Sequence, residues 1–191
     1  MNIKCEICDG YYVLRHGKFG LFTGCSNFPR CLSKMGLAKL VQIFFQIHGV
    51  NVYRWDRICF KCNNKTPIYS YFLYYDLAVL GGGLGNHFRS RHGIGLGDLR
   101  SIDKRLEDEL SSIKMRYSKT IKESYVANIC IHCGVTQGYQ YTVSDPHEIF
   151  YELILTRDME KYLYKTLRLS DPNAFLRDIQ PFFMSNQQDK P

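Results

Sequence analysis

The fold of the N-terminal part of the chain is decided by Cys5-Glu6-Ile7-Cys8 and, further along, Cys25-Ser26-Asn27-Phe28-Pro29-Arg30-Cys31. These four cysteines have the spacing C-x2-C-x16-C-x5-C. Zn²⁺ prefers four thiolates in a tetrahedron, and a C-x2-C knuckle lets one tight turn aim two thiolates at the same ion. Because so short a segment buries too little apolar material to fold securely alone, the pattern predicts a module stapled by zinc.

The other four cysteines of the chain form a second set. Cys59, Cys62, Cys130 and Cys133 are spaced C-x2-C-x67-C-x2-C, and no cysteine is left over. We therefore expect two structural Zn²⁺ sites. His132 lies inside a knuckle, but four cysteines already fill the tetrahedron, so we do not expect it to be a ligand. A filled tetrahedron also leaves no open position for catalysis.

Disulfides are the alternative use of eight cysteines, and they would suit a secreted chain. The opening Met1-Asn2-Ile3-Lys4 runs into Cys5 without an apolar signal-peptide core. No stretch reaches the roughly 18 apolar residues of a membrane span. The sequence therefore favours zinc in a reducing, cytoplasmic setting, with no membrane partner.

The net charge of +7 overstates how basic the protein is. Each Zn²⁺ with four thiolates carries −2, so two filled sites lower the formal charge from +7 to +3. Residues 1–49 hold six basic residues against two acidic ones, so the N-terminal part is the more basic. The basic balance alone is weak support for nucleic-acid binding, and its concentration near the first cysteine set matters more.

The pattern of apolar residues and turns predicts an α+β protein with two domains. Residues 1–49 should form a zinc ribbon with a following helix, capped by Ser33 and ending at Gly49. Residues 50–191 should form a second zinc-stapled domain of short antiparallel strands and peripheral helices, with a long insert at 63–129. The expected strands are 11–15, 19–23, 66–75, 125–130 and 139–144. The expected helices are 33–48, 98–113 (capped by Asp98 or Ser101), 145–155 and 171–179.

Two further motifs surround the first cysteine set. One is the R-x-G-K-F-G-x-F turn at 15–22, and the other is the G-C-S-N-F-P-x-C ending at 24–31. With these motifs, residues 4–32 closely resemble the four-cysteine zinc ribbons in the C-terminal region of bacterial DNA topoisomerase I. The resemblance covers about a sixth of the chain, which has no room for the topoisomerase catalytic domain. Residues 59–72 and 116–143 resemble uncharacterised bacterial zinc-ribbon domains, which bring no function with them.

The topoisomerase resemblance implies binding of single-stranded DNA. Aromatic rings there would stack on bases, at about 1–3 kcal/mol per base, and cations would contact phosphates. The residues that match these roles are Arg15, Lys18, Phe19, Phe22, Phe28 and Arg30. Without a recognition helix, the sequence preference should be weak. The alternative for the three phenylalanines is that they fill the small core of the ribbon.

The expected function is therefore that of a non-enzymatic two-zinc protein that binds single-stranded or distorted DNA, with RNA left open. A protein-interaction adaptor is the alternative, with an aromatic surface made of Trp55, Tyr69, Tyr71 and Tyr74. A metal-dependent nuclease using His87, His92 and Asp98 is a third hypothesis, but no further metal-binding residue follows them at a recognisable spacing.

Overall fold

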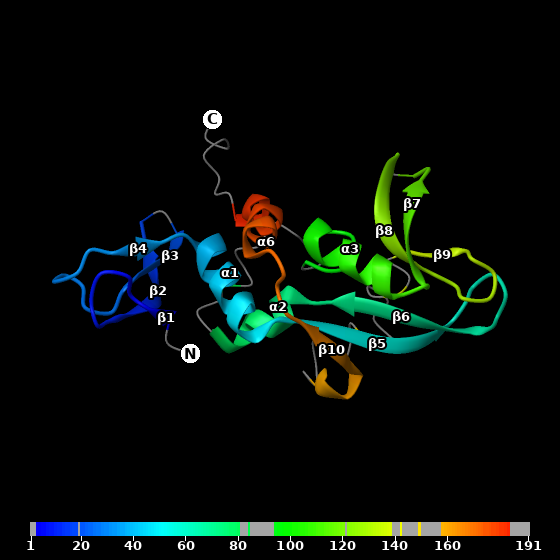
Figure 1. The fold of residues 1–191 in the computed structure, drawn as a ribbon, viewed down its shortest axis with the longest axis horizontal. Coiled ribbons are helices and arrows are strands. Elements are labelled where there is room, and N and C mark those ends of the chain that lie inside the picture. The colour runs from blue at the N-terminus through cyan, green and yellow to red at the C-terminus, as the bar shows by residue number, and fades with distance from the viewer. Residues whose placement is uncertain are drawn as a thin grey trace.

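The computed structural model describes residues 3–18, 20–80, 84, 94–120, 122–138, 142, 149 and 158–183. The molecule is elongated, with a small sheet at one end, helices and a second sheet in the middle and a third sheet at the other end (Figure 1). Helices and antiparallel strands together make an α+β protein with an N-terminal ribbon, as the sequence predicts. No helix among the described residues is long and apolar enough to cross a membrane.

The N-terminal sheet consists of four antiparallel strands in the order β1-β2-β3-β4. These are β1 (Ile3–Lys4), β2 (Tyr11–Gly17), β3 (Gly20–Cys25) and β4 (Lys34–Met35). One face is buried against the first helix, where Tyr12, Met35 and Leu40 share a core with three of the cysteines. Because side chains alternate along a strand, the intervening residues point to the other, outer face.

Helix α1 (Leu37–His48) begins later than predicted. Gly36, with an extended ψ of 147°, is its N-cap residue, and Ser33 precedes a strand, β4, that the apolar pattern did not reveal. The predicted end at Gly49 is confirmed: its φ is 78° and its amide donates to the Phe45 carbonyl at 2.7 Å. A Cβ at Gly49 would lie 2.6 Å from Thr166 Cγ2, so both the conformation and the close approach favour glycine.

The central sheet has the order β10-β5-β6, all antiparallel. It consists of β5 (Val50–Ile58), β6 (Lys65–Tyr71) and β10 (Leu163–Leu167). The predicted strand to Tyr75 is too long, since α2 (Leu73–Leu77) and the 3-10 turn η1 (Ala78–Leu80) follow Tyr71. The pairing of β10 with β5 brings together segments more than a hundred residues apart, and the sequence did not predict it.

Helix α3 (Arg100–Glu109) is capped differently from the prediction. Leu99 is the N-cap residue and no side chain caps the helix. The Asp98 carboxylate accepts from the Gly95 amide instead, at 2.8 Å, and the Ser101 amide donates to Asp178 at 2.7 Å. The helix ends at Glu109 and not at the predicted 113, because the next residue, Leu110, has an extended backbone with φ of −120° and ψ of 116°.

The third sheet has the order β7-β8-β9. Its strands are β7 (Ile113–Ser118), β8 (Glu123–Ile129) and β9 (Thr136–Gln137). The predicted strand at 139–144 and helix at 145–155 lie outside the described residues, except for Thr142 and Ile149.

The predicted helix at 171–179 is confirmed as α6 (Pro172–Ile179), with short 3-10 turns nearby at η3 (Glu160–Tyr162) and η4 (Gln180–Phe183). The Asp171 carboxylate caps it by accepting from the amides of Asn173 and Ala174, both at 2.9 Å. Proline at the first helical position lacks an N–H that would be unsatisfied there, which suits this start.

The largest hydrophobic cluster lies between α1, α3 and α6 and extends onto the central sheet. Phe45 of α1 meets Phe175 of α6 edge to face, with ring centroids 5.5 Å apart. The core therefore continues across residue 49, and the division into domains at that point stays a prediction.

Candidate metal centres and nucleic-acid interface

The first four-thiol centre lies at the end of the N-terminal sheet. The sulfur atoms of Cys5, Cys8, Cys25 and Cys31 all lie within 4.8 Å of one another. Cys8 Sγ is 3.4 Å from Cys25 Sγ, and Cys5 Sγ is 3.8 Å from Cys31 Sγ. Zn–S bonds of about 2.3 Å in a tetrahedron require sulfur atoms roughly 3.8 Å apart, so the four thiols fit Zn²⁺.

Neighbouring N–H groups point at these sulfur atoms. The Ile7 amide donates to Cys5 Sγ at 3.5 Å and helps to lower the pKa of that thiol to about 6. Asn27 donates twice, from its backbone to Cys25 and from its side chain to Cys8. Gly10 is needed because a Cβ there would lie 2.9 Å from Cys25 Sγ. The sequence did not single out Asn27, although its place between two ligands was a signal.

The second four-thiol centre joins two turns at the far end of the molecule. Cys59 Sγ is 3.7 Å from Cys133 Sγ, and Cys62 Sγ is 3.6 Å from Cys130 Sγ. All four sulfur atoms lie within 4.8 Å of one another. Asn63 and Gly134 follow the knuckles with φ of 55° and 69°, the left-handed conformation that closes such turns. The prediction of two groups that can each hold a zinc ion is therefore confirmed.

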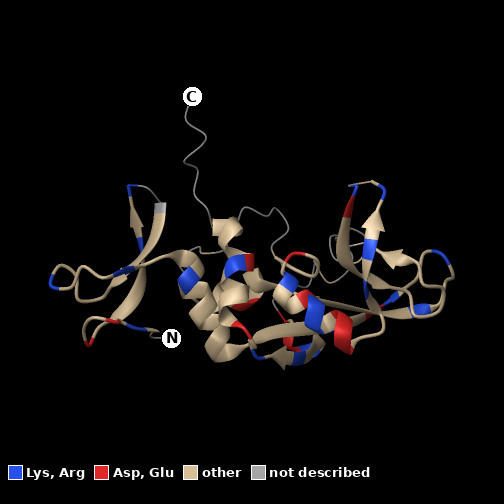
Figure 2. Cartoon of the chain, turned by 45° about the horizontal axis from the view of Figure 1, so that its top comes forward, with Lys and Arg blue, Asp and Glu red and all other residues tan. Residues whose placement is uncertain are grey.

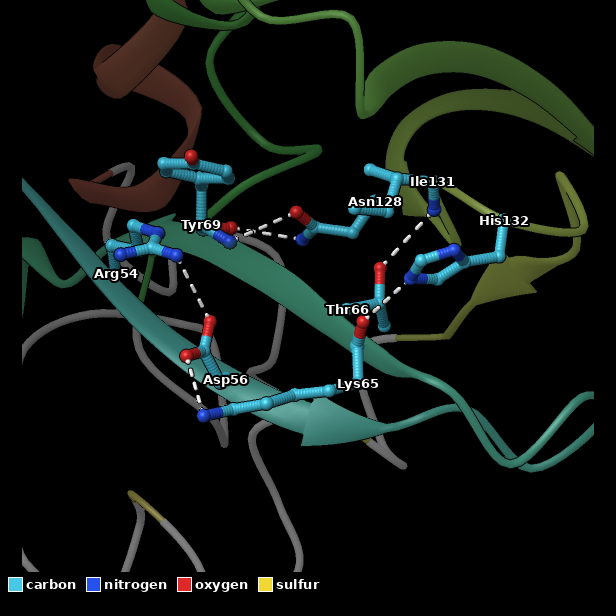
Figure 3. Close-up of polar contacts among 8 residues, drawn as sticks. All are labelled: Arg54, Asp56, Lys65, Thr66, Tyr69, Asn128, Ile131 and His132. Carbon is cyan, nitrogen blue, oxygen red and sulfur yellow. Dashed lines mark hydrogen bonds and ion pairs between the residues drawn. The ribbon is translucent and has the colours of Figure 1, made fainter.

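A row of polar contacts fixes the second centre to the edge of β6 (Figure 3). The Asn128 amide group donates to the Tyr69 carbonyl at 2.8 Å and accepts from the Tyr69 amide at 2.9 Å. The Ile131 amide donates to Thr66 Oγ1 at 3.2 Å. His132 Nε2 lies 2.9 Å from the Lys65 carbonyl oxygen, so His132 contacts the main chain of β6 and is not one of the four ligands.

The outer face of the N-terminal sheet carries a groove of about 570 Å³. Its lining includes Arg15 on β2, Phe22 on β3, Lys34 on β4, and Phe28 and Leu32 from the segment around the last ligand. A second hollow, of about 370 Å³, is lined by Cys8, Asn27, Phe28, Pro29, Arg30 and Cys31. Phe28 borders both hollows and its side chain is 58% exposed, so the interpretation of this ring as core filling is wrong.

Arg15 is held in place at the floor of the groove. It lies directly opposite Phe22 in the β2–β3 pair, and its Nη2 donates to the Cys25 carbonyl at 3.1 Å. Its Cζ lies 5.8 Å from the centroid of the Phe28 ring, which is cation–π distance. A Cβ at Gly24 would meet Phe22 at 3.3 Å and Arg15 at 3.4 Å, so this glycine lets both side chains lie across the strand.

Lys34 is a groove residue that the sequence did not single out. It pairs with Gly24 across β3 and β4, and its Nζ lies 5.9 Å from the centroid of the half-buried Phe22 ring. Only the strand pairing brings it beside Phe22, although a lysine three residues after the last ligand was a weak signal.

The remaining predicted nucleic-acid residues are less central. Arg30 is exposed in the second hollow, and Lys18 is exposed after β2. Phe19 lies outside the described residues. The structure thus brings Arg15, Phe22 and Phe28 together in one groove and places Arg30 in a second hollow that shares Phe28 with it.

The aromatic surface expected for the adaptor reading is wrong for three of its four residues. Trp55, Tyr69 and Tyr71 are buried in hydrophobic clusters that pack against the central sheet, and only Tyr74 is exposed. For the nuclease reading, His87 and His92 lie outside the described residues, and Asp98 contacts the Gly95 amide. Within the part of the chain that the structure describes, the two cysteine sets are the groups that can hold a metal ion.

Comparison with known proteins found a family match for the N-terminal module. Residues 2–39 match the family of topoisomerase DNA-binding C4 zinc fingers. The match includes the first four-thiol centre, the grooved sheet and the start of α1, and it implies zinc and nucleic-acid binding for this module. No solved structure matches the chain.

Proposed function

We propose that this is a non-catalytic two-zinc protein that binds single-stranded or distorted DNA through the outer face of its N-terminal ribbon. The observation that carries the proposal is the exposed Phe28 ring between two hollows that hold cationic residues. The match of residues 2–39 to a DNA-binding zinc-finger family supports it.

The chemistry of this face suits an unpaired strand. Every base has a π-face, so an exposed aromatic ring can stack on any of them, at about 1–3 kcal/mol per base. Phe28 offers such a ring, and Arg30 and Lys34 lie in the hollows on its two sides, where phosphates would pass. Stacking and phosphate contacts do not read base edges, so we expect weak sequence preference and strong salt dependence.

The four-thiol centres support a structural role for both metals. Four thiolates complete a tetrahedron, and a catalytic zinc needs a position open to water or substrate. The zinc of the first centre would hold Cys25 and Cys31 on both sides of the Phe28 loop and so fix the stacking ring.

Fluorescence anisotropy of the zinc-loaded full chain with a labelled single-stranded oligonucleotide tests this function. Phe28→Ala should weaken binding by roughly 5- to 150-fold, the loss of one stacked base. Tyr74→Ala, which removes an exposed aromatic ring from α2, is the matched control and should leave binding unchanged. Equal affinities for the two variants would sink the stacking interface.

A further inference from the structure

The hairpin of β7 and β8 lies at the opposite end of the molecule from the ribbon (Figure 1). Its base is fixed in the core, where Ile113 and Val126 are buried and Asn128 bonds to β6. From Arg116 and Tyr125 outward, every described residue is exposed or half-buried. We call residues 114–120 and 122–125 the arm.

The arm is strongly basic. Its cations are Lys114, Arg116, Lys119 and Lys122, and its one acidic residue is Glu123. None of these four cations has an ion-pair partner among the residues that the structure describes. Figure 2 shows basic residues gathered at the free end of the hairpin, while the acidic residues 107–109 lie on α3. Like charges left unpaired on a projecting element favour an anionic partner.

The two faces of the arm differ. Arg116 lies opposite Tyr125 on one face, and Met115 and Tyr117, which are 50% and 63% exposed, lie on the other. The arm is thus a two-stranded antiparallel hairpin that carries cations along its length. The outer face of the N-terminal sheet carries a groove instead, which suits single bases and not a duplex.

We propose that the arm is a second nucleic-acid-binding surface and that it binds a duplex. The major groove of B-DNA admits a two-stranded β-ribbon, and the phosphates on both rims of the groove would then face the arm cations. The contact would be made to the backbone and so be largely independent of sequence. This inference goes beyond the proposed function, because the arm and the ribbon groove share no residue.

The test measures binding of the zinc-loaded full chain to a short blunt-ended duplex and to a single strand over a range of salt concentrations. Lys119→Gln with Lys122→Gln should weaken duplex binding roughly 10-fold near 0.1 M salt and reduce the salt slope by about 2, one phosphate contact per lysine. Binding of the single strand should not change. The matched control is Arg100→Gln with Lys104→Gln, which removes two exposed charges from α3 and should leave the slope as it was.

Two results would overturn the arm as a duplex site: no duplex binding by the unmodified chain, or the same loss in the arm variant and in the α3 control. The fate of the proposed function is separate, because it depends on the effect of Phe28→Ala on the single strand. A chain that binds duplex through Lys119 and Lys122 but ignores single strands would keep this inference and lose the proposed function.

Discussion

The two four-cysteine centres have the same chemistry, but they organise different structures. The first closes a turn within one sheet and places Phe28 in the open between two hollows. The second closes two turns from different sheets, and its neighbours Asn128, Ile131 and His132 bond to β6. The first centre therefore supports an exposed surface, and the second centre connects two sheets.

This difference follows from how far apart the ligands are in sequence. Ligands 5–31 lie within one small sheet, so metal there orders a short segment. The two knuckles of the second set are 67 residues apart, so metal there closes a long loop that contains β6, α3, β7 and β8. Closing a long loop removes more conformational entropy from the unfolded chain, and it should matter more for the core.

Loss of one ligand at each centre is expected to have the largest effect. Structural zinc contributes on the order of 10 kcal/mol to the folding of small zinc modules. Cys130→Ser should lose one zinc and the protection of β6 and β8 amides from hydrogen exchange. Cys25→Ser should also lose one zinc, yet the amides of α1 and β5 should stay protected. Equal loss of core protection in both variants would contradict the distinction, as would a zinc content of the unmodified chain below two.

Asn128→Ala tests the connection between the second centre and β6 without changing a cysteine ligand. It removes two hydrogen bonds and leaves the N–H and C=O of Tyr69 without these partners in a buried place, which should lower the free energy of unfolding by about 2–4 kcal/mol. Asn173→Ala, on the exposed side of α6, should stay within about 0.5 kcal/mol of the unmodified chain. Chemical denaturation of the zinc-loaded protein measures both. Similar midpoints for the two variants would mean that the hydrogen bonds between Asn128 and Tyr69 do not stabilise the fold.

The core between the two centres should respond to pH through Asp103. Burial, together with the charges of Asp98 and Asp178, raises the pKa of the Asp103 carboxyl to about 8, although Tyr71 and Gly97 donate to it. The folded state therefore holds a proton that the unfolded state has already lost, and stability should fall as pH rises toward 8. Between pH 6.5 and 8.5 we expect a loss of roughly 1–2 kcal/mol.

Asp103→Asn should remove most of this dependence of stability on pH, even if it also changes the stability at any single pH. The pKa of Asp76 is also raised by burial, to about 6, so Asp76 contributes mainly below this range. Denaturation midpoints at several pH values give the measurement. A slope that persists in the variant would show that another group titrates.

The smallest expected effect concerns Lys34, which completes the groove beside Phe22. Lys34→Gln should weaken single-strand binding by about 3-fold and reduce the salt slope by about 0.7, the value of one phosphate contact on a single strand. Lys61→Gln makes the same change in a knuckle of the second centre and should alter neither quantity. If Lys34→Gln and Lys61→Gln change the affinity and the salt slope equally, Lys34 makes no specific contact with the DNA.

Local spacing explains what the sequence could predict. The C-x2-C knuckles of the ligand sets, the glycine end of α1 and the start of α6 at Asp171-Pro172 depend on residues that are close in the chain. Strand β10 and the Asn128 contacts depend on segments that meet only after folding, and no local pattern reports them. The sequence alone does not reveal that Tyr69 and Tyr71 are buried, because aromatic residues favour strands whether or not their face of the sheet is covered.

Photocross-linking tests the central claim most directly. The zinc-loaded chain would be irradiated with a single-stranded oligonucleotide that carries halogenated uridine, and the attached peptides would be identified by mass spectrometry. Cross-links within residues 20–34, centred on Phe28 and lost in Phe28→Ala, are the result that the proposed interface predicts. Specific cross-links that all fall outside residues 20–34 would contradict it.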